Sequence, residues 1–198
     1  FGADVGAISE AHHYAKEVAT GNLPFLLTSC CPSWSMMAKK LFPQFKENIS
    51  MALTPMVITA RMVKKDYPDA RIVFIGPCAA KKLEANRKSV RSDVDFVLTF
   101  EELQGMFDAK DINFAEIETD PADSMDEGTG FGRGFAVGGG VAAAVVEAIK
   151  HIDPSREIQI EYGDGLRECK KMLMMAKAGK RNGYLLEGMG CPGGCVAG

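Results

Sequence analysis

The feature that most constrains this fold is the distribution of its six cysteines, five of which lie in three short motifs separated by tens of residues. The motifs are TSCCPSW at 28–34, GPCAAKK at 76–82 and EGMGCPGGC at 187–195. Glycine, proline or both in each motif let the backbone bend around an inorganic core and direct N–H groups at its sulfurs. Zinc ribbons and ferredoxins gather their ligands in compact runs. This chain must instead fold before the three segments can share one metal centre.

Four of these cysteines can act together as ligands of one iron–sulfur cluster, which needs four soft thiolates that converge on one point. They are Cys31, Cys78, Cys191 and Cys195, and Cys30 is left as a free thiol beside them. Each cysteine taken singly is also compatible with a small buried side chain of the core. The three motifs together, each with its own glycine or proline, favour cluster binding.

The three motifs resemble the signature motifs of the FeFe hydrogenase catalytic domain, the H-cluster domain, in the same order and at comparable spacings over residues 1–198. The cofactor of that family is a 4Fe–4S cubane joined through one cysteine sulfur to a two-iron unit with CO, cyanide and azadithiolate ligands. The resemblance implies that Cys31, Cys78, Cys191 and Cys195 bind the cubane and that Cys195 is the bridge. It also implies an enzyme that reversibly converts protons and electrons into H2.

Residues beside the implied ligands match catalytic positions of the family. Cys30 matches the proton-donating thiol, and a thiol suits that role because its pKa is close enough to neutrality. Lys81 matches the lysine that holds a cyanide ligand by a charge-assisted hydrogen bond, whereas Lys82 is predicted to be a surface side chain. Four further residues are implied to contact the cofactor, namely Met189, Phe135, Pro77 and Ala79.

Three more positions match a route for protons. Glu10 matches the family's first relay glutamate when residues are counted back from the first motif, and Ser50 matches its relay serine when they are counted forward. His13 occupies the position of the next relay carboxylate, and an imidazole can shuttle protons near neutral pH. Glu10 and His13 could instead lie on the polar face of a surface helix, and the sequence leaves both interpretations open.

Two departures from the family pattern leave three classes of function open. Gly76 stands where many members carry Met, and Met56 stands where they carry a polar amide, so the wall of the implied two-iron pocket differs. The classes are an enzyme that makes or oxidises H2, a sensory or regulatory relative with the same cofactor, and a non-catalytic iron–sulfur assembly factor that carries only the cubane. Cys30 and Lys81 favour the first two classes, because both serve the two-iron unit.

The composition is that of an ordinary globular chain and gives no support for a nucleic-acid partner or a membrane span. The 198 residues are 46% hydrophobic and 25% charged, and the net charge of −3 gives no case for nucleic acid. No apolar run reaches the length that a membrane span needs. The cysteines fit a metal site in a reducing compartment, so we expect a cytoplasmic protein. The first residue is Phe, and we expect the natural start, with any leader, to be missing.

We expect one H-cluster-like domain over residues 1–198, incomplete at both ends, with two possible lobes at roughly 1–90 and 91–198. No further cysteine-rich region is present, so electrons must come from a ferredoxin-like partner or from a missing N-terminal iron–sulfur domain. The resemblance also implies H2 and protons as substrates and maturation proteins as partners.

Helical and strand-like patterns alternate along the chain. Helices are predicted at 3–19, 34–41, 54–67, 100–107, 140–151 and 166–178, and strands at 23–28, 71–75, 95–99, 157–162 and 184–186. Cys169, in the last helix, is predicted to pack in the core, and 120–130 is predicted to be a loop. The alternation predicts an α/β fold. Its two small lobes are expected to have mostly parallel sheets flanked by helices, with the cluster site buried between them.

Overall fold

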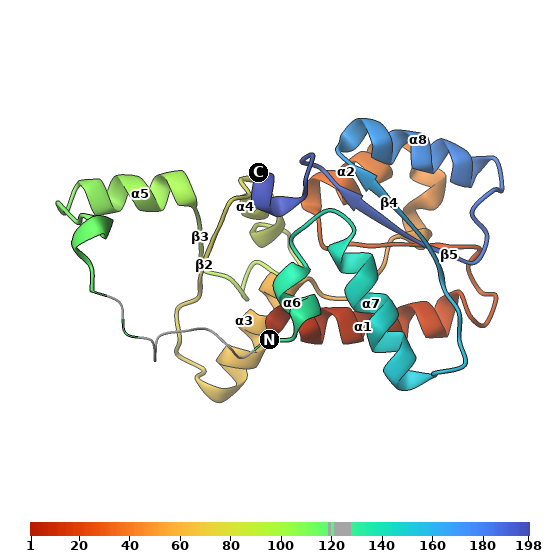
Figure 1. Ribbon diagram of the computed structural model, residues 1–198, viewed down its shortest axis with the longest axis horizontal. Coiled ribbons are helices and arrows are strands. Elements are labelled where there is room, and N and C mark those ends of the chain that lie inside the picture. The colour runs from red at the N-terminus through yellow and green to blue at the C-terminus, as the bar shows by residue number, and fades with distance from the viewer. Residues whose placement is uncertain (119, 121–127) are drawn as a thin grey trace.

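The computed structural model describes residues 1–118, 120 and 128–198 and confirms the predicted α/β class (Figure 1). The helices are α1 (Gly2–Glu17), α2 (Pro32–Leu41), α3 (Pro55–Asp66), α4 (Ala80–Ala85), α5 (Phe100–Asp108), α6 (Gly130–Gly134), α7 (Gly140–Ile152) and α8 (Leu166–Lys177), with 3-10 helices η1 (Pro43–Asn48), η2 (Phe114–Glu116) and η4 (Cys195–Ala197). The strands are β1 (Leu26–Leu27), β2 (Val73–Gly76), β3 (Phe96–Thr99), β4 (Gln159–Asp164) and β5 (Tyr184–Met189). The predicted loop at 120–130 lies mostly outside the described residues.

The larger sheet has the strand order β1-β5-β4, and both of its strand pairs are parallel. Helices α1 and α7 lie together on one side of it, and α2 and α8 lie on the other side (Figure 1). Residues 185–189 of the central strand β5 are all buried, as expected for a parallel strand covered on both faces. Fully buried leucines of β1 and β5 pack with Trp34 and Val145 in the main core. Cys169 belongs to the same core, which confirms that prediction.

The smaller sheet pairs β2 with β3, also in parallel. Met56, Val57 and Ala60 of α3 form a second, smaller core with Val90 and Val94. Phe74 and Val97, which are direct partners in the two strands, pack against this core from one face of the sheet. Alternate strand residues point to opposite faces, so each strand contributes one buried row and one outer row of side chains.

Two helix starts follow from local sequence. Pro55 occupies the first turn of α3 after Thr54, where its missing N–H costs little. Thr99 and Glu102 form a reciprocal capping box at the start of α5. The short helices α4 and α6 were not predicted, because each has too few residues to show a helical period. Among the described residues, no helix is long and apolar enough to cross a membrane.

The pairing of strands does not follow the order of the chain. β1, near the start of the chain, pairs with β5, near its end. β2, which precedes residue 90, pairs with β3, which follows it. Each sheet therefore combines segments from both sides of that position. How the chain divides into domains remains a prediction.

Candidate metal centre

The three cysteine motifs follow the carboxyl ends of three strands. Cys31 follows β1 and is the N-cap residue of α2, where its backbone is extended (φ −93°, ψ 111°). Cys78 follows β2, and Cys191 follows β5. Because β1 and β5 are parallel neighbours, the first and third motifs leave the same edge of one sheet. Cys195 comes after a turn whose glycines, Gly193 and Gly194 among them, have positive φ values of 86° and 85°.

Electrostatic coupling among the candidate thiols indicates that the three motifs converge in space. The pKa of Cys195 is raised to about 11, first by burial and then by negative charge on Cys31, Cys78 and Cys191. Burial, followed by the charges of Cys31 and Cys78, also raises the pKa of Cys191. The backbone N–H of Gly190, in the third motif, donates to Sγ of Cys31, in the first, at 3.3 Å. The four thiols therefore share one neighbourhood, although Cys31 is buried and Cys191 is exposed.

The donor set consists of four thiols, and soft thiolates are the ligands of iron–sulfur clusters. Among the described residues, no three His, Cys, Asp or Glu side chains lie close enough to hold one ion. In a cubane, each of four thiolates binds a different iron, so the four sulfurs need not lie as close together as the ligands of a single ion. The backbone is also tight here, since a Cβ on Gly190 would lie 2.8 Å from Cβ of Ser33 and 3.6 Å from Sγ of Cys31. Four soft donors on glycine-lined backbone are the groups that would hold a 4Fe–4S cubane.

Cys30 is under the electrostatic influence of one cation and two buried carboxyl groups. Burial, and then the negative charges of Glu187 and Glu10, raise the pKa of this thiol well above its usual value, whereas Lys81 lowers it. The Lys81 ammonium donates to the Cys30 carbonyl oxygen at 3.1 Å and to Oε2 of Glu84 at 2.7 Å. Cys30 therefore keeps its proton at neutral pH, and Lys81 is held beside it.

The predicted proton-route residues Glu10 and Ser50 lie close together. Glu10 is buried in α1, and its Oε1 has no hydrogen-bond partner among the described residues. Burial raises the pKa of Glu10 to about 8, and a hydrogen bond with Ser50 opposes that shift. Glu10 also acts electrostatically on Cys30, so the buried carboxyl group lies near the thiol as well as the serine.

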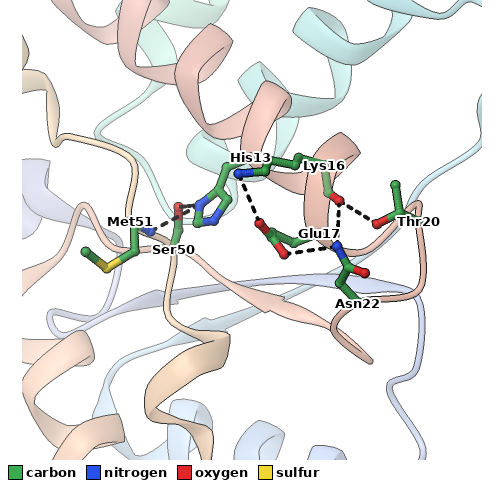
Figure 2. Close-up of polar contacts among 7 residues, drawn as sticks. All are labelled: His13, Lys16, Glu17, Thr20, Asn22, Ser50 and Met51. Carbon is green, nitrogen blue, oxygen red and sulfur yellow. Dashed lines mark hydrogen bonds and ion pairs between the residues drawn. The ribbon is translucent and has the colours of Figure 1, made fainter.

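His13 follows Glu10 by three residues on α1, and Figure 2 shows its ring beside Ser50 and Met51. Its Nδ1 lies 2.8 Å from Oγ of Ser50 and accepts the backbone N–H of Met51 at 3.1 Å. An Nδ1 that accepts this N–H carries no proton, so the imidazole is neutral. While Glu10 is protonated, the Ser50 hydroxyl donates to this nitrogen, and when Glu10 ionises the same single proton serves the carboxylate instead. Burial lowers the pKa of His13, which agrees with the neutral form. The side chain is half-buried and bound to Ser50, and Lys16 and Glu17 follow it along the helix at 3.7 Å from each other.

The other residues predicted to contact the cofactor differ in how deeply they are buried. Met189 is buried at the end of β5, and Phe135 packs against the main core. Pro77 is half-buried beside Cys78, whereas Ala79 is exposed at the N-cap of α4.

The two positions that depart from the family pattern are both buried. Met56 belongs to the smaller core, and Gly76 ends β2. A Cβ on Gly76 would lie 2.9 Å from the Phe74 ring, so a larger residue at this position would require Phe74 to move.

Two buried carboxylates near the site were missed from the sequence. Glu84 bridges the Lys81 ammonium and the Thr54 hydroxyl, the latter at 2.6 Å. Glu187 accepts backbone N–H groups from the start of α7, including that of Ala142 at 2.7 Å, and burial raises its pKa to about 7. The signals were present, because Glu84 follows Lys81 by three residues and Glu187 interrupts an apolar strand.

The chain matches known proteins over its whole length. A family model described as the iron only hydrogenase large subunit, C-terminal domain, matches residues 1–198. Iron hydrogenase 1 of Clostridium pasteurianum is 31% identical over 238 residues, which cover 100% of this chain and 41% of that protein. A cytosolic Fe-S cluster assembly factor of Phaeosphaeria nodorum is 33% identical over 124 residues, which cover 51% of this chain and 20% of that protein.

A solved structure gives the same fold. It is a variant of the FeFe-hydrogenase from Chlamydomonas reinhardtii, with a TM-score of 0.74 and 25% sequence identity. The match covers 100% of this chain and 68% of that one. The chain therefore spans less than half the length of iron hydrogenase 1, and it resembles both a hydrogenase and an assembly factor.

Proposed function

The chain belongs to the family of the iron only hydrogenase large subunit, C-terminal domain, and from this premise we propose that it is the catalytic part of a hydrogenase. In this proposal, Cys31, Cys78, Cys191 and Cys195 would hold a 4Fe–4S cubane, and Cys195 would also hold the two-iron unit with its CO, cyanide and azadithiolate ligands. When bound, this cofactor supplies heterolytic splitting or formation of H2 and one-electron transfer.

The protein's own residues handle the protons. Cys30 holds a proton at Sγ, because burial keeps its pKa well above neutrality. Glu10, with a pKa of about 8, is also mostly protonated near pH 7. Ser50 donates to the unprotonated Nδ1 of His13 and so links the buried carboxyl group to a base nearer the surface. Protons pass along Cys30, Glu10, Ser50 and His13 in either direction.

Lys81 orients an anionic ligand of the two-iron unit. Its ammonium is nearly buried and donates to Oε2 of Glu84 at 2.7 Å. A fixed cation at this depth favours a negatively charged acceptor much more than a solvated lysine would. Pro77 and Met189 keep the surroundings apolar, and Phe135 and Ala79 are proposed to complete the contacts around the cofactor.

The observation that carries the proposal is the buried Glu10 beside the Ser50–His13 pair. A buried carboxyl oxygen without a partner costs about 1–3 kcal/mol of stability. A protein that only carried a cubane would gain nothing from this cost, whereas a proton route through the interior needs such a group.

Two alternatives remain as second candidates. The similarity to the Phaeosphaeria nodorum assembly factor favours a cubane carrier without the two-iron unit. The substitutions at Gly76 and Met56 favour a sensory or regulatory relative that binds the full cofactor. For each candidate we propose a cytoplasmic protein. For the hydrogenase we also propose maturation proteins as partners, and a ferredoxin-like partner or an N-terminal iron–sulfur domain as the electron source.

Infrared spectroscopy and iron analysis separate these candidates. The chain is expressed anaerobically with maturation proteins and purified without oxygen. The hydrogenase proposal expects CO and cyanide bands, about six irons per chain and H2 turnover. Bands without turnover would favour the regulatory alternative, and about four irons without bands would favour the assembly factor.

Two cysteine variants and one control test the assigned roles within that experiment. Cys78→Ala should lose its iron, whereas Cys169→Ser should keep it, because Cys169 packs in the core. Cys30→Ala should keep the infrared bands and lose at least about 100-fold in turnover, because a methyl group cannot relay a proton. Iron retained in Cys78→Ala, or full turnover in Cys30→Ala, would contradict the assignment.

A further inference from the structure

A hollow of about 420 Å³ opens between the segment at 46–54, helix α3 and the loop that follows α4. It does not include any of the candidate cysteine ligands. Six charged residues line it, and they are Lys39, Lys46, Glu47, Arg61, Glu84 and Arg87. Its size is within the range of small-molecule sites in proteins.

The charges in this hollow do not balance. Arg61 forms an ion pair with Asp93 at 3.0 Å, and Glu84 is paired with Lys81, which lies outside the hollow. Among the described residues, Lys39, Lys46 and Arg87 have no ion pair with a carboxylate. Glu47 is the single anion left to oppose them, which gives a formal charge of +2 (three positive, one negative). The whole chain, by contrast, carries a net charge of −3.

The three unpaired cations line the same hollow and act on one another electrostatically. The pKa of Lys39 is lowered, first by burial and then by the positive charges of Arg87 and Lys46. Like charges gathered in a partly desolvated hollow repel one another, and a bound anion would turn that repulsion into attraction. Lys39 comes from α2, Lys46 from η1 and Arg87 from the loop after α4. The fold therefore brings together three cations that are scattered along the sequence.

The remaining lining limits the class of anion. The hydroxyl groups of Ser29, Ser35 and Thr54 already donate to protein oxygens, at 3.0, 3.3 and 2.6 Å respectively. Two further serines, Ser50 and Ser89, also line the hollow. The net attraction for an anion comes from the three cations. Aliphatic side chains such as Ile49 and Val57 form the apolar part, and no aromatic ring is among the lining residues that the structure describes. A nucleotide base would find no ring on which to stack.

We infer that this hollow binds a small aliphatic anion with at least two negatively charged oxygen groups, held by Lys39, Lys46 and Arg87. Phosphate compounds and polycarboxylates share this chemistry. Arg87 can engage two oxygens at once, whereas the two lysines act as point charges. Ser50 of the proposed proton route also lines the hollow. None of the three cations takes part in the proton route or in cofactor binding, so anion binding is tested separately from the hydrogenase function.

Calorimetric titration of the full chain tests this site, in low-salt buffer free of phosphate. Pyrophosphate and citrate are the two multivalent probes, and acetate is the monovalent control. We expect at least one multivalent probe to bind at least tenfold more tightly than acetate, and the tighter of the two identifies a phosphate or a carboxylate preference. Binding should weaken as NaCl is added, because salt screens charge interactions.

Matched variants locate the binding. Lys39→Met and Arg87→Met should each weaken binding by about tenfold, because each removes a charge-assisted contact. Lys40→Met is the control, since Lys40 is the next residue on α2 and does not line the hollow. All three substitutions change exposed or half-buried side chains, and thermal unfolding checks that the fold is retained.

Three results would overturn the inference. The first is no binding of pyrophosphate or citrate at millimolar concentration. The second is binding that Lys39→Met and Arg87→Met leave unchanged, or that Lys40→Met weakens equally. The third is binding of a polyglutamate peptide but of neither small anion, which would assign the surface to an acidic protein instead.

Discussion

Replacing Glu84 by Gln should destabilise the chain far more than a surface substitution of the same kind. The Lys81 and Glu84 side chains are only 11% and 3% exposed, and their charged atoms lie 2.7 Å apart. In Glu84→Gln the amide oxygen can accept from Lys81, and the amide N–H group can donate to the Thr54 hydroxyl. The hydrogen bonds can therefore be kept while the negative charge is lost. An ammonium group left buried without a counter-charge costs about 3–5 kcal/mol, and we expect a value near 3 kcal/mol.

The chain offers a matched control on its surface. Lys171 and Glu168 have the same spacing of three residues and the same distance of 2.7 Å, but their side chains are 59% and 49% exposed. Glu168→Gln should cost less than about 1 kcal/mol, because exposed ion pairs contribute little. Both variants are compared by anaerobic urea unfolding of the cluster-free chain, with the midpoint and the denaturant slope fitted separately.

A double variant distinguishes two causes of lost stability: the loss of the ion pair itself, and the burial of an ammonium group without a counter-charge. Lys81→Met combined with Glu84→Gln removes the buried ammonium, so it should recover about 2 kcal/mol relative to Glu84→Gln alone. The reasoning would be refuted if Glu84→Gln cost no more than Glu168→Gln. It would also be refuted if the double variant were less stable than Glu84→Gln.

Three further predictions concern single positions. Burial raises the pKa of Glu10 from its ordinary value of 4.5 to about 8. Between pH 4.5 and about 8 the folded chain therefore keeps a proton on Glu10 that the unfolded chain releases. The free energy of unfolding falls as pH rises through this window. Glu10→Gln should therefore flatten the fall in urea stability between pH 5 and 8 by up to about 1.4 kcal/mol per pH unit, and an unchanged slope would contradict the raised pKa. Gly188→Ala would place a Cβ 2.1 Å from the Trp34 ring and should lower the free energy of unfolding by about 3 kcal/mol, whereas a loss below about 1 kcal/mol in thermal unfolding would mean that the ring can move aside. His13→Ala should remove the acceptor of the Ser50 hydroxyl and slow H2 turnover without changing the infrared bands. His13→Glu should restore turnover with a lower pH optimum. An unchanged rate and pH profile in His13→Ala would show that protons take another route.

The sequence alone was sufficient for the features that depend on neighbouring residues. The helices at α3, α7 and α8 follow from apolar periodicity and from local signals such as Pro55 in a first turn. The parallel α/β class follows from the alternation of strand and helix patterns, and the family follows from the three cysteine motifs. The placement of Cys169 in the core was also predictable, because it has no glycine or proline context and lies in an amphipathic helix.

The tertiary structure decided which distant residues share an environment. Pairing of β1 with β5 places the first and third motifs at one sheet edge, although more than half of the chain separates them. Glu84, an ordinary charged residue in the sequence, becomes a buried partner of Lys81 only because α4 packs against α2 and β3. His13 could have faced solvent, and the segment at 49–51 instead brings Ser50 and the Met51 amide to its ring. Burial and hydrogen-bond partners depend on contacts between elements far apart in the chain, and neither residue type nor periodicity encodes which elements will meet.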